Sequence, residues 1–286
     1  MKDKVSIIIP VYKNIHFLNQ SLYSAINQTY KNIEVLLIND GNTLEDKKKI
    51  YKVRSKFKKK NISIINIKKN KGVSNALNVG IKKSKGQYIS WLSHDDFFSL
   101  KKTEEQIKFL KKKNAKVCSC DFIEINKIKN YKITRTLDQN YFDDQVLSII
   151  LNDSLHGCSL LIEKKCFDKN FFDRKYKHIQ DYDLWAKMSE KYMFIHLNKK
   201  LLFSFKHTSQ NSYVKKDEST VEKLKFYKSL VENKLIIYDY KNFIYIFKFI
   251  YRSLIKYRSP SLAQSILKKY LFYKFYNYLN LYLRKN

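Results

Sequence analysis

Residues 5–41, VSIIIPVYKNIHFLNQSLYSAINQTYKNIEVLLINDG, decide the fold class of this chain. The stretch begins with a β-branched run over residues 5–9, which stops at Pro10, and continues with apolar residues at helical spacing over residues 15–26. A second β-branched run over residues 33–38 stops at the turn sequence Asn-Asp-Gly. Apolar strands joined by a helix in this way predict parallel strands covered on both faces.

The same alternation continues along the chain and predicts a mostly parallel α/β sheet. Residues 47–57 and 73–83 have the pattern of helices, and residues 62–67 and 88–92 have that of strands. Beyond these the pattern is less regular. The further elements that it predicts are strands over 116–125, 131–137, 159–162 and 203–207, helices over 143–151 and 181–191, and helical structure from about residue 215 onward.

The composition excludes several classes of protein and leaves the cause of the charge open. Five glycines and four cysteines in 286 residues exclude collagen-like chains and disulfide scaffolds, and 44% hydrophobic residues argue against disorder. The net charge of +31, from 57 Lys and Arg against 26 Asp and Glu, attracts phosphate of any kind. It fits a nucleic-acid or anionic-surface partner, or a lysine-rich composition set by an AT-rich genome.

The cysteines and the apolar runs predict a reduced, cytoplasmic protein. The four cysteines, at positions 118, 120, 158 and 166, form no CxxC pair and have no histidine at zinc spacing, so we expect buried thiols. No run reaches the ~18 apolar residues of a membrane span. The N-terminus also lacks the apolar core of a secretory signal.

The C-terminal region differs in composition from the rest of the chain. Residues 241–286 hold ten Lys or Arg and no Asp or Glu, and basic residues recur there on one helical face. We expect a first domain over residues 1–214 and a basic, aromatic, helical extension over residues 215–286. The extension fits the surface of an anionic membrane, or it packs on its own domain with solvated lysines.

The ends of the predicted strands carry polar residues and no phosphate loop. Ligands of parallel sheets bind beyond those ends, where this chain has Pro10-Val11-Tyr12, Asn39-Asp40-Gly41 and Ser93-His94-Asp95-Asp96. Neither GxGxxG nor GxxxxGK[ST] occurs, which disfavours nicotinamide enzymes and P-loop ATPases. The two adjacent carboxylates repel each other, so a divalent metal is a physical reason for the pair. The alternative is that one of them caps the helix that starts near Leu100.

Four segments together resemble the family 2 glycosyltransferases. They are VSIIIPVYKN (5–14), SLYSAINQTYKNIEVLLINDGNT (21–43), NKGVSNALNVGIKKSKGQYISWLSHDD (70–96) and HIQDYDLWAKM (178–188). They occur in the order and spacing of that family over roughly residues 3–213. The resemblance implies the GT-A fold, a nucleotide-binding αβα sandwich with a mostly parallel sheet, followed here by the helical extension.

By this resemblance, one set of residues would bind a nucleotide-sugar. Asp40 matches the aspartate that accepts a hydrogen bond from a uracil-type base, although the common Asp-Asp is Asn39-Asp40 here. Leu77 stands where an arginine is common, and Ser93 replaces the first aspartate of the acidic motif. The residues expected to bind the nucleotide-sugar are Pro10, Val11, Tyr12, Asp40, Lys71, Asn75, Asn78 and Asp95.

The resemblance also implies a metal and a catalytic base. Asp96 would ligate Mn²⁺ or Mg²⁺ on the diphosphate, and His207 would reach the metal or the diphosphate. Asp181 matches the family's catalytic base; the alternative is that it only caps its helix. The residues expected on the acceptor side are His156 and Trp185, with a core role as the alternative for the tryptophan.

The implied function is an inverting, metal-dependent transfer of a sugar, from a nucleotide-sugar of UDP type to a hydroxyl. The acceptor would be a glycan or lipid-linked glycan of a bacterial surface, such as capsule, lipooligosaccharide or O-antigen. Residues 241–286 would rest on the cytoplasmic face of the inner membrane. Two alternatives remain open: a nucleic-acid-binding protein, for which no helix-turn-helix, zinc-finger or RNP signature is present, and an inactive scaffold, because of Asn39, Leu77 and Ser93. We expect no nucleic-acid partner.

Overall fold

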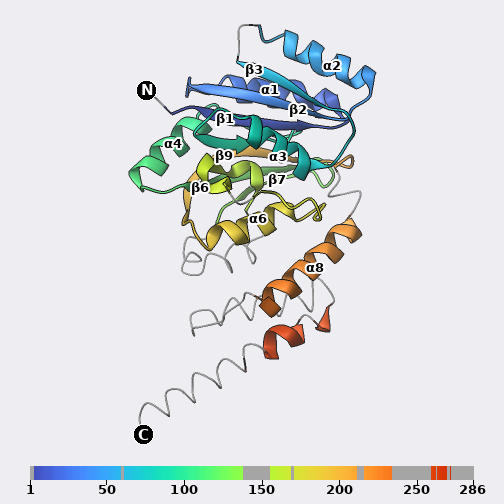
Figure 1. The fold of residues 1–286 in the computed structure, drawn as a ribbon, viewed down its shortest axis with the longest axis vertical. Helices are drawn as coiled ribbons and strands as arrows, with labels where there is room; N and C mark the ends of the chain where they lie inside the picture. The colour runs from blue at the N-terminus through green and yellow to red at the C-terminus, as the bar shows by residue number, and fades with distance from the viewer. Residues whose placement is uncertain are drawn as a thin grey trace.

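The described part of this computed structural model is built around one nine-stranded sheet (Figure 1). The strand order is β3-β2-β1-β4-β8-β6-β9-β5, and β7 pairs with β6 outside this path. The residues that the structure describes are 3–58, 61–137, 155–168, 171–210, 216–233, 259–261, 263–268 and 271.

The first four strands of the sheet are parallel, as the sequence predicts. They are β1 (Val5–Val11), β2 (Ile33–Asp40), β3 (Ile62–Ile67) and β4 (Tyr88–Trp91). The helices between them are α1 (Leu18–Ile26), α2 (Leu44–Ser55) and α3 (Val73–Lys83). Right-handed crossovers place α3 on the opposite face from α1 and α2, because the chain reverses its direction across the sheet after β3 (Figure 1).

Strand β1 does not stop at Pro10, contrary to the prediction. It runs on to Val11, with Pro10 opposite Ile38 of β2. The backbone of Ile8 faces β4, since its carbonyl accepts from the N–H of Leu92, and Pro10, two residues on, faces the same side. The pairing of β1 with β4 ends at Ile8, so the missing N–H of the proline breaks no ladder bond.

The second half of the sheet mixes parallel and antiparallel pairs. Its strands are β5 (Phe97–Phe98), β6 (Val117–Asn126), β7 (Tyr131–Arg135), β8 (Leu161–Glu163) and β9 (Phe194–Lys206). The pair β6 and β9 is parallel, whereas β8 is antiparallel to both β4 and β6. Strand β9 is much longer than the strand predicted over 203–207. Its exposed residues Asn198 to Lys200 lie at a break in the register with β6, and this bulge hides the strand pattern.

The remaining helices close the described fold. They are α4 (Lys102–Lys112), α6 (Gln180–Ser189), α8 (Lys216–Asn233) and the 3₁₀ turns η1 (Ile15–Phe17), η3 (Gly157–Ser159) and η4 (Lys164–Phe167). The predicted helix over 143–151 and most of the region 241–286 lie outside the described residues. The division at residue 214 also falls in a segment that is not described, and it stays a prediction.

Two further sequence-based expectations can be compared with the structure. All four cysteines are buried free thiols, as expected. None of the described helices is both long and apolar enough to cross a membrane.

Candidate functional site

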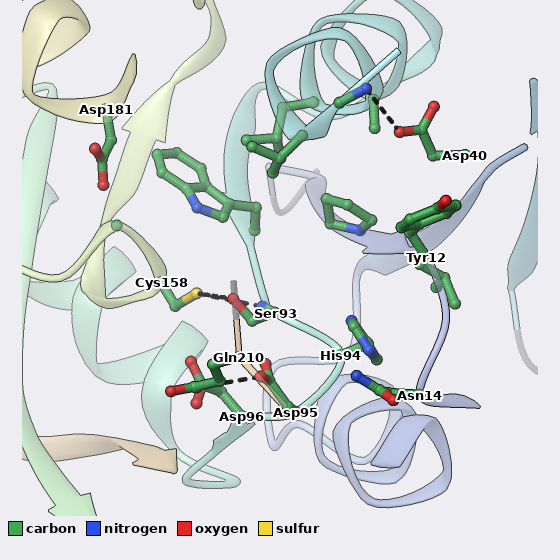
Figure 2. Close-up of a pocket in the computed structure, with 18 of the residues that line it drawn as sticks. Tyr12, Asn14, Asp40, Ser93, His94, Asp95, Asp96, Cys158, Asp181 and Gln210 are labelled. Atoms are coloured by element: carbon green, nitrogen blue, oxygen red, sulfur yellow. Dashed lines mark hydrogen bonds between the residues drawn. The ribbon is translucent and has the colours of Figure 1, made fainter. Parts of the chain in front are cut away.

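A cavity of about 690 Å³ lies at the carboxyl ends of β1, β2 and β4. Its other walls come from the η3 turn, the start of α6 and the end of β9. Figure 2 shows Asp40 and Asp181 on opposite sides of this cavity, with the pair Asp95 and Asp96 beside it. The expected site residues that line it are Pro10, Val11, Tyr12, Asp40, Asp95, Asp96, His156, Asp181 and His207.

Four of the expected site residues do not line the cavity. Asn78 uses its side chain to bind the backbone of Phe172, donating to the carbonyl at 2.8 Å and accepting from the N–H at 3.0 Å. Trp185 is fully buried and stacks on Trp91 with 5.2 Å between ring centroids, which corresponds to the core alternative. Asn78 and Trp185 therefore have structural roles in place of the ligand contacts that the sequence predicted. The other two residues are Lys71, which offers its backbone N–H to Asp40, and Asn75, which contacts Arg174.

The carboxylate of Asp40 is held by the loop that precedes α3. It accepts hydrogen bonds from the N–H groups of Lys71 and Gly72 at 3.2 and 3.1 Å, and from Nδ2 of Asn70 at 2.9 Å. Burial raises the pKa of Asp40, and the two N–H groups lower it. The loop comes this close because the neighbouring Gly41 has φ of +71° and no side chain; a Cβ there would lie 2.1 Å from the backbone nitrogen of Asn70.

The side-chain amide of Asn39 hydrogen-bonds to two neighbouring amides. Its Nδ2 donates to Asn66 Oδ1 at 2.8 Å, and its Oδ1 accepts from the side chain of Asn42 at 2.7 Å. Asn42 also donates to the carbonyl of Val11 at 2.8 Å and accepts from the N–H of Lys13 at 2.7 Å. This amide network joins the ends of β1 and β2 beside the cavity, and Asn39 both donates and accepts in it. The sequence analysis missed Asn42, whose only signal is its place after a strand-end turn.

The two adjacent aspartates have different surroundings. Asp96 is 3% exposed; its Oδ1 accepts from the N–H of Phe205 at 3.0 Å, and its Oδ2 lies 3.6 Å from Nε2 of His156. Burial, with repulsion from Asp95, raises the pKa of Asp96 well above its ordinary value. Neither aspartate caps α4, because the N-cap residue is Lys101 and the first-turn N–H of Thr103 donates to Oε1 of Gln28 at 2.9 Å. The capping alternative is therefore wrong.

Asp95 meets two side chains that follow β9. Its Oδ2 lies 3.1 Å from Nε2 of His207 and 3.2 Å from Nε2 of Gln210. The His207 ring packs on Phe17 with 4.6 Å between centroids, and its Nδ1 is buried with no hydrogen-bond partner among the described residues. Gln210 was missed by the sequence analysis, although it lies in a polar stretch after a strand end.

The spacing of Asp95 and His207 fits a divalent cation. Two ligands at about 2.1 Å from one ion and at right angles to each other are about 3.0 Å apart. The observed 3.1 Å between Oδ2 of Asp95 and Nε2 of His207 matches this spacing. In this structure Nε2 of His207 donates its proton to Oδ2 of Asp95, so an ion bound at this place would take the position of that proton.

A second group, Asp96, His156 and Cys158, offers ligand atoms within 4.8 Å of one another. Nδ1 of His156 accepts the N–H of Cys158 at 3.1 Å, so the proton of the neutral ring is on Nε2, which faces Ser204 Oγ at 3.1 Å. Burial lowers the pKa of His156 to about 4 and raises that of the Cys158 thiol. Metal-bound histidines donate from their second nitrogen, whereas Nδ1 of His156 accepts here, so in this arrangement the three residues are joined by hydrogen bonds rather than set as ligands.

Asp181 is the second residue of α6 and lines the cavity. The N-cap of this helix is Ile179, so the alternative that Asp181 acts as the cap is wrong. Burial raises its pKa to about 6, against smaller lowering effects from the N–H of Tyr182 and the charge of Lys223. Helical geometry turns Asp183 about 200° away from Asp181. The structure shows this too, because Asp183 pairs with Lys187 on α6.

The family model described as Glycosyl transferase family 2 matches residues 6–200 of this chain. The chain belongs to glycosyl transferase family 2. This match favours a glycosyltransferase over the nucleic-acid-binding alternative, and it agrees with the four segments singled out in the sequence.

Curated relatives of this family 2 chain are described as glycosyltransferases. An uncharacterised glycosyltransferase of Rickettsia prowazekii is 38% identical over 189 residues, which are 64% of this chain and 58% of that protein. An uncharacterised glycosyltransferase of Haemophilus influenzae is 28% identical over 260 residues, 84% of this chain and 96% of that protein. The chain thus spans little more than half the length of the Rickettsia relative.

Solved structures share the fold of this family 2 chain. Staphylococcus aureus TarS 1–349, in complex with UDP-GlcNAc, superposes with a TM-score of 0.67 at 18% identity, covering 88% of this chain and 73% of that one. A mannosyltransferase from Pyrobaculum calidifontis, in complex with GDP-Man and Mn²⁺, gives a TM-score of 0.66 at 11% identity, covering 94% and 74%. These similarities confirm the predicted GT-A fold class.

Proposed function

We propose that this chain transfers a sugar from a nucleotide-sugar to a hydroxyl group, with inversion at the anomeric carbon. The observation that carries the proposal is the position of Asp181, a carboxylate with a raised pKa across the cavity from the nucleotide-side residue Asp40. The two similar structures have a UDP-sugar and a GDP-sugar bound. A cavity of about 690 Å³ has the volume of a small-molecule site.

The donor would lie along the ends of β1 and β2. The carboxylate of Asp40 is fixed by three donors and lines the cavity, so it is placed to accept an N–H of a base such as uracil. Tyr12 is 37% exposed and lines the same wall, where its ring can pack against the base or the ribose. We propose a UDP-sugar as the donor class.

Asp95 and His207 would hold the divalent metal, Mn²⁺ or Mg²⁺, in place of the Asp96 expected from the sequence. Their ligand atoms have the spacing of neighbouring positions around one ion, whereas Asp96 is directed at β9. When bound, such an ion stabilises negative charge on the diphosphate that leaves. Asp96 instead fixes the backbone of Phe205, and with it the part of β9 that leads to His207.

Asp181 would act as the general base. With a pKa of about 6 it is mostly ionised at neutral pH and basic enough to take a proton from a hydroxyl as that hydroxyl attacks. A single displacement needs one base only, and Asp183 is turned away and paired with Lys187. Asp181, His156 and Gly157 all line the cavity, and we propose that the acceptor enters on their side of it.

The acceptor and the cellular location extend this proposal beyond the site. We propose a glycan or lipid-linked glycan of the bacterial surface as the acceptor. The basic extension over 241–286 would rest on the anionic cytoplasmic face of the inner membrane, because it has ten basic and no acidic residues.

The test of the function is transfer by Asp181→Asn against the unchanged protein. The substitution should abolish sugar transfer from UDP-sugars in Mn²⁺ and leave the donor dissociation constant within twofold, measured by calorimetry. Retained turnover would remove Asp181 from its role. Slow release of UDP from UDP-sugars by the unchanged protein would exclude the inactive-scaffold alternative, and its complete absence across a donor panel would support that alternative.

A further inference from the structure

Helix α8 contacts the segment that leads into α6. Figure 1 shows α8 beside α6 on the side of the molecule away from α2. Glu218, Glu222 and Phe226 are one turn apart and therefore lie on one face of α8. That face meets residues 176–179, because all three side chains have partners there.

The carboxylate of Glu222 binds three consecutive backbone N–H groups. Its Oε1 accepts from Lys177 at 2.8 Å, and its Oε2 accepts from His178 at 2.7 Å and from Ile179 at 3.2 Å. The N-cap of α6, Ile179, has no side chain able to cap a helix. A carboxylate from a distant element thus binds the N–H of the N-cap residue and of the two residues before it, and its negative charge also suits the positive end of the helix.

Other contacts hold the same segment from two sides. The ring of Tyr176 meets the edge of Phe226 with 5.9 Å between centroids, and Phe226 is 3% exposed. On the other side, Ser74 of α3 donates to the carbonyl of Tyr176 at 3.4 Å. Lys223, next to Glu222, lies 5.4 Å from the centre of the Tyr182 ring. Residues 176–182 are therefore held between α3 and α8.

The segment that Glu222 holds forms one wall of the cavity. Lys177, His178, Gln180 and Asp181 all line it. The backbone N–H groups bound by Glu222 end two residues before Asp181, so a movement of this turn moves the carboxylate of Asp181 with it. Misplacement of a reacting group by about 1 Å can cost about a hundredfold in rate.

We propose that Glu222 is a positioning residue for the transfer reaction, which sets the place of Asp181 by holding the backbone of residues 177–179. The proposal rests on the proposed function, because it takes Asp181 as the base. It also makes α8 a working part of the catalytic unit, although the sequence assigns this helix to the C-terminal extension.

The experiment compares Glu222→Ala and Glu222→Gln with Asp217→Asn in the full chain. Asp217 is an exposed acid on the first turn of α8, so Asp217→Asn removes the same charge without a contact to the segment. We expect kcat to fall at least about tenfold in Glu222→Ala and by less in Glu222→Gln, whose amide oxygen still accepts. The donor dissociation constant should stay within twofold in both, and Asp217→Asn should match the unchanged protein.

A kcat of Glu222→Ala within twofold of the unchanged protein would overturn the proposal, and so would an equal loss in Asp217→Asn. If Glu222→Ala does not fold, as judged by circular dichroism, the same criteria apply to Glu222→Gln. Turnover retained by Asp181→Asn would instead refute the proposed base, which separates the two failures.

Discussion

The substitution Asp181→Asn should stabilise the fold at neutral pH while it removes activity. Folding places this carboxyl in the cavity wall, where burial raises its pKa from 3.8 to about 6. Below about pH 4 the carboxyl is protonated in both the folded and the unfolded chain, so it contributes no penalty. Above about pH 6 it is ionised in both, and the folded state bears the cost of the poorly solvated charge.

The size of this effect follows from the pKa. The rise from 3.8 to about 6 corresponds to a loss of about 3 kcal/mol of stability as the pH goes from about 4 to about 6. This figure is an upper bound, because the side chain of Asp181 is partly exposed. Asparagine has the same shape and no charge. The variant should therefore exceed the unchanged protein by up to about 3 kcal/mol at pH 7 and equal it below pH 4.

Urea denaturation at pH 4, 5, 6, 7 and 8 measures this difference directly. The matched control is Asp183→Asn, two residues further along α6, which breaks the pair with Lys187 and should lower stability at pH 7. The reasoning is refuted if Asp181→Asn is less stable than the unchanged protein at pH 7, or if the difference between them does not change with pH. The unchanged enzyme should also lose kcat tenfold per pH unit below about pH 6, as the base becomes protonated.

Two further predictions concern the donor side of the cavity. Gly41→Ala should lower the free energy of unfolding by roughly 2–4 kcal/mol in urea denaturation, because φ is +71° and the new Cβ would meet the backbone of Asn70. Gly72→Ala should lower it by only about 1–2 kcal/mol, because φ there is +86° but the Cβ would enter open space. Equal costs would contradict the close approach at Gly41. Asp95→Asn and His207→Ala should each weaken Mn²⁺-dependent binding of UDP-sugar at least about tenfold by calorimetry. Asp96→Asn should weaken it less, because the amide oxygen can still accept the N–H of Phe205. If Asp96→Asn weakened binding more than Asp95→Asn and His207→Ala, Asp96 would be the metal ligand instead.

The sequence was most informative where one local pattern carries the structure. The four parallel strands were predicted from apolar runs, since β1, β2 and β4 are covered on both faces and bury nearly every side chain. Their carboxyl ends then indicated Asp40 and the pair of aspartates, because ligand sites of such sheets lie there. Most of the long strand β9 was not predicted, since the exposed residues at its bulge interrupt the strand pattern.

The chain alone thus determined its family, its parallel half-sheet and the acidic residues at the strand ends. All of these depend on residues close together in sequence, and their apolar spacing and their order along the chain can be recognised without a structure. Only the tertiary structure decided that Asp95 rather than Asp96 faces His207, because that contact joins residues 112 positions apart. It also decided that Trp185 is core and that a carboxylate of α8 binds the backbone that leads into α6. Such roles depend on which side chain fills a space that distant elements leave, and a linear pattern does not contain that information.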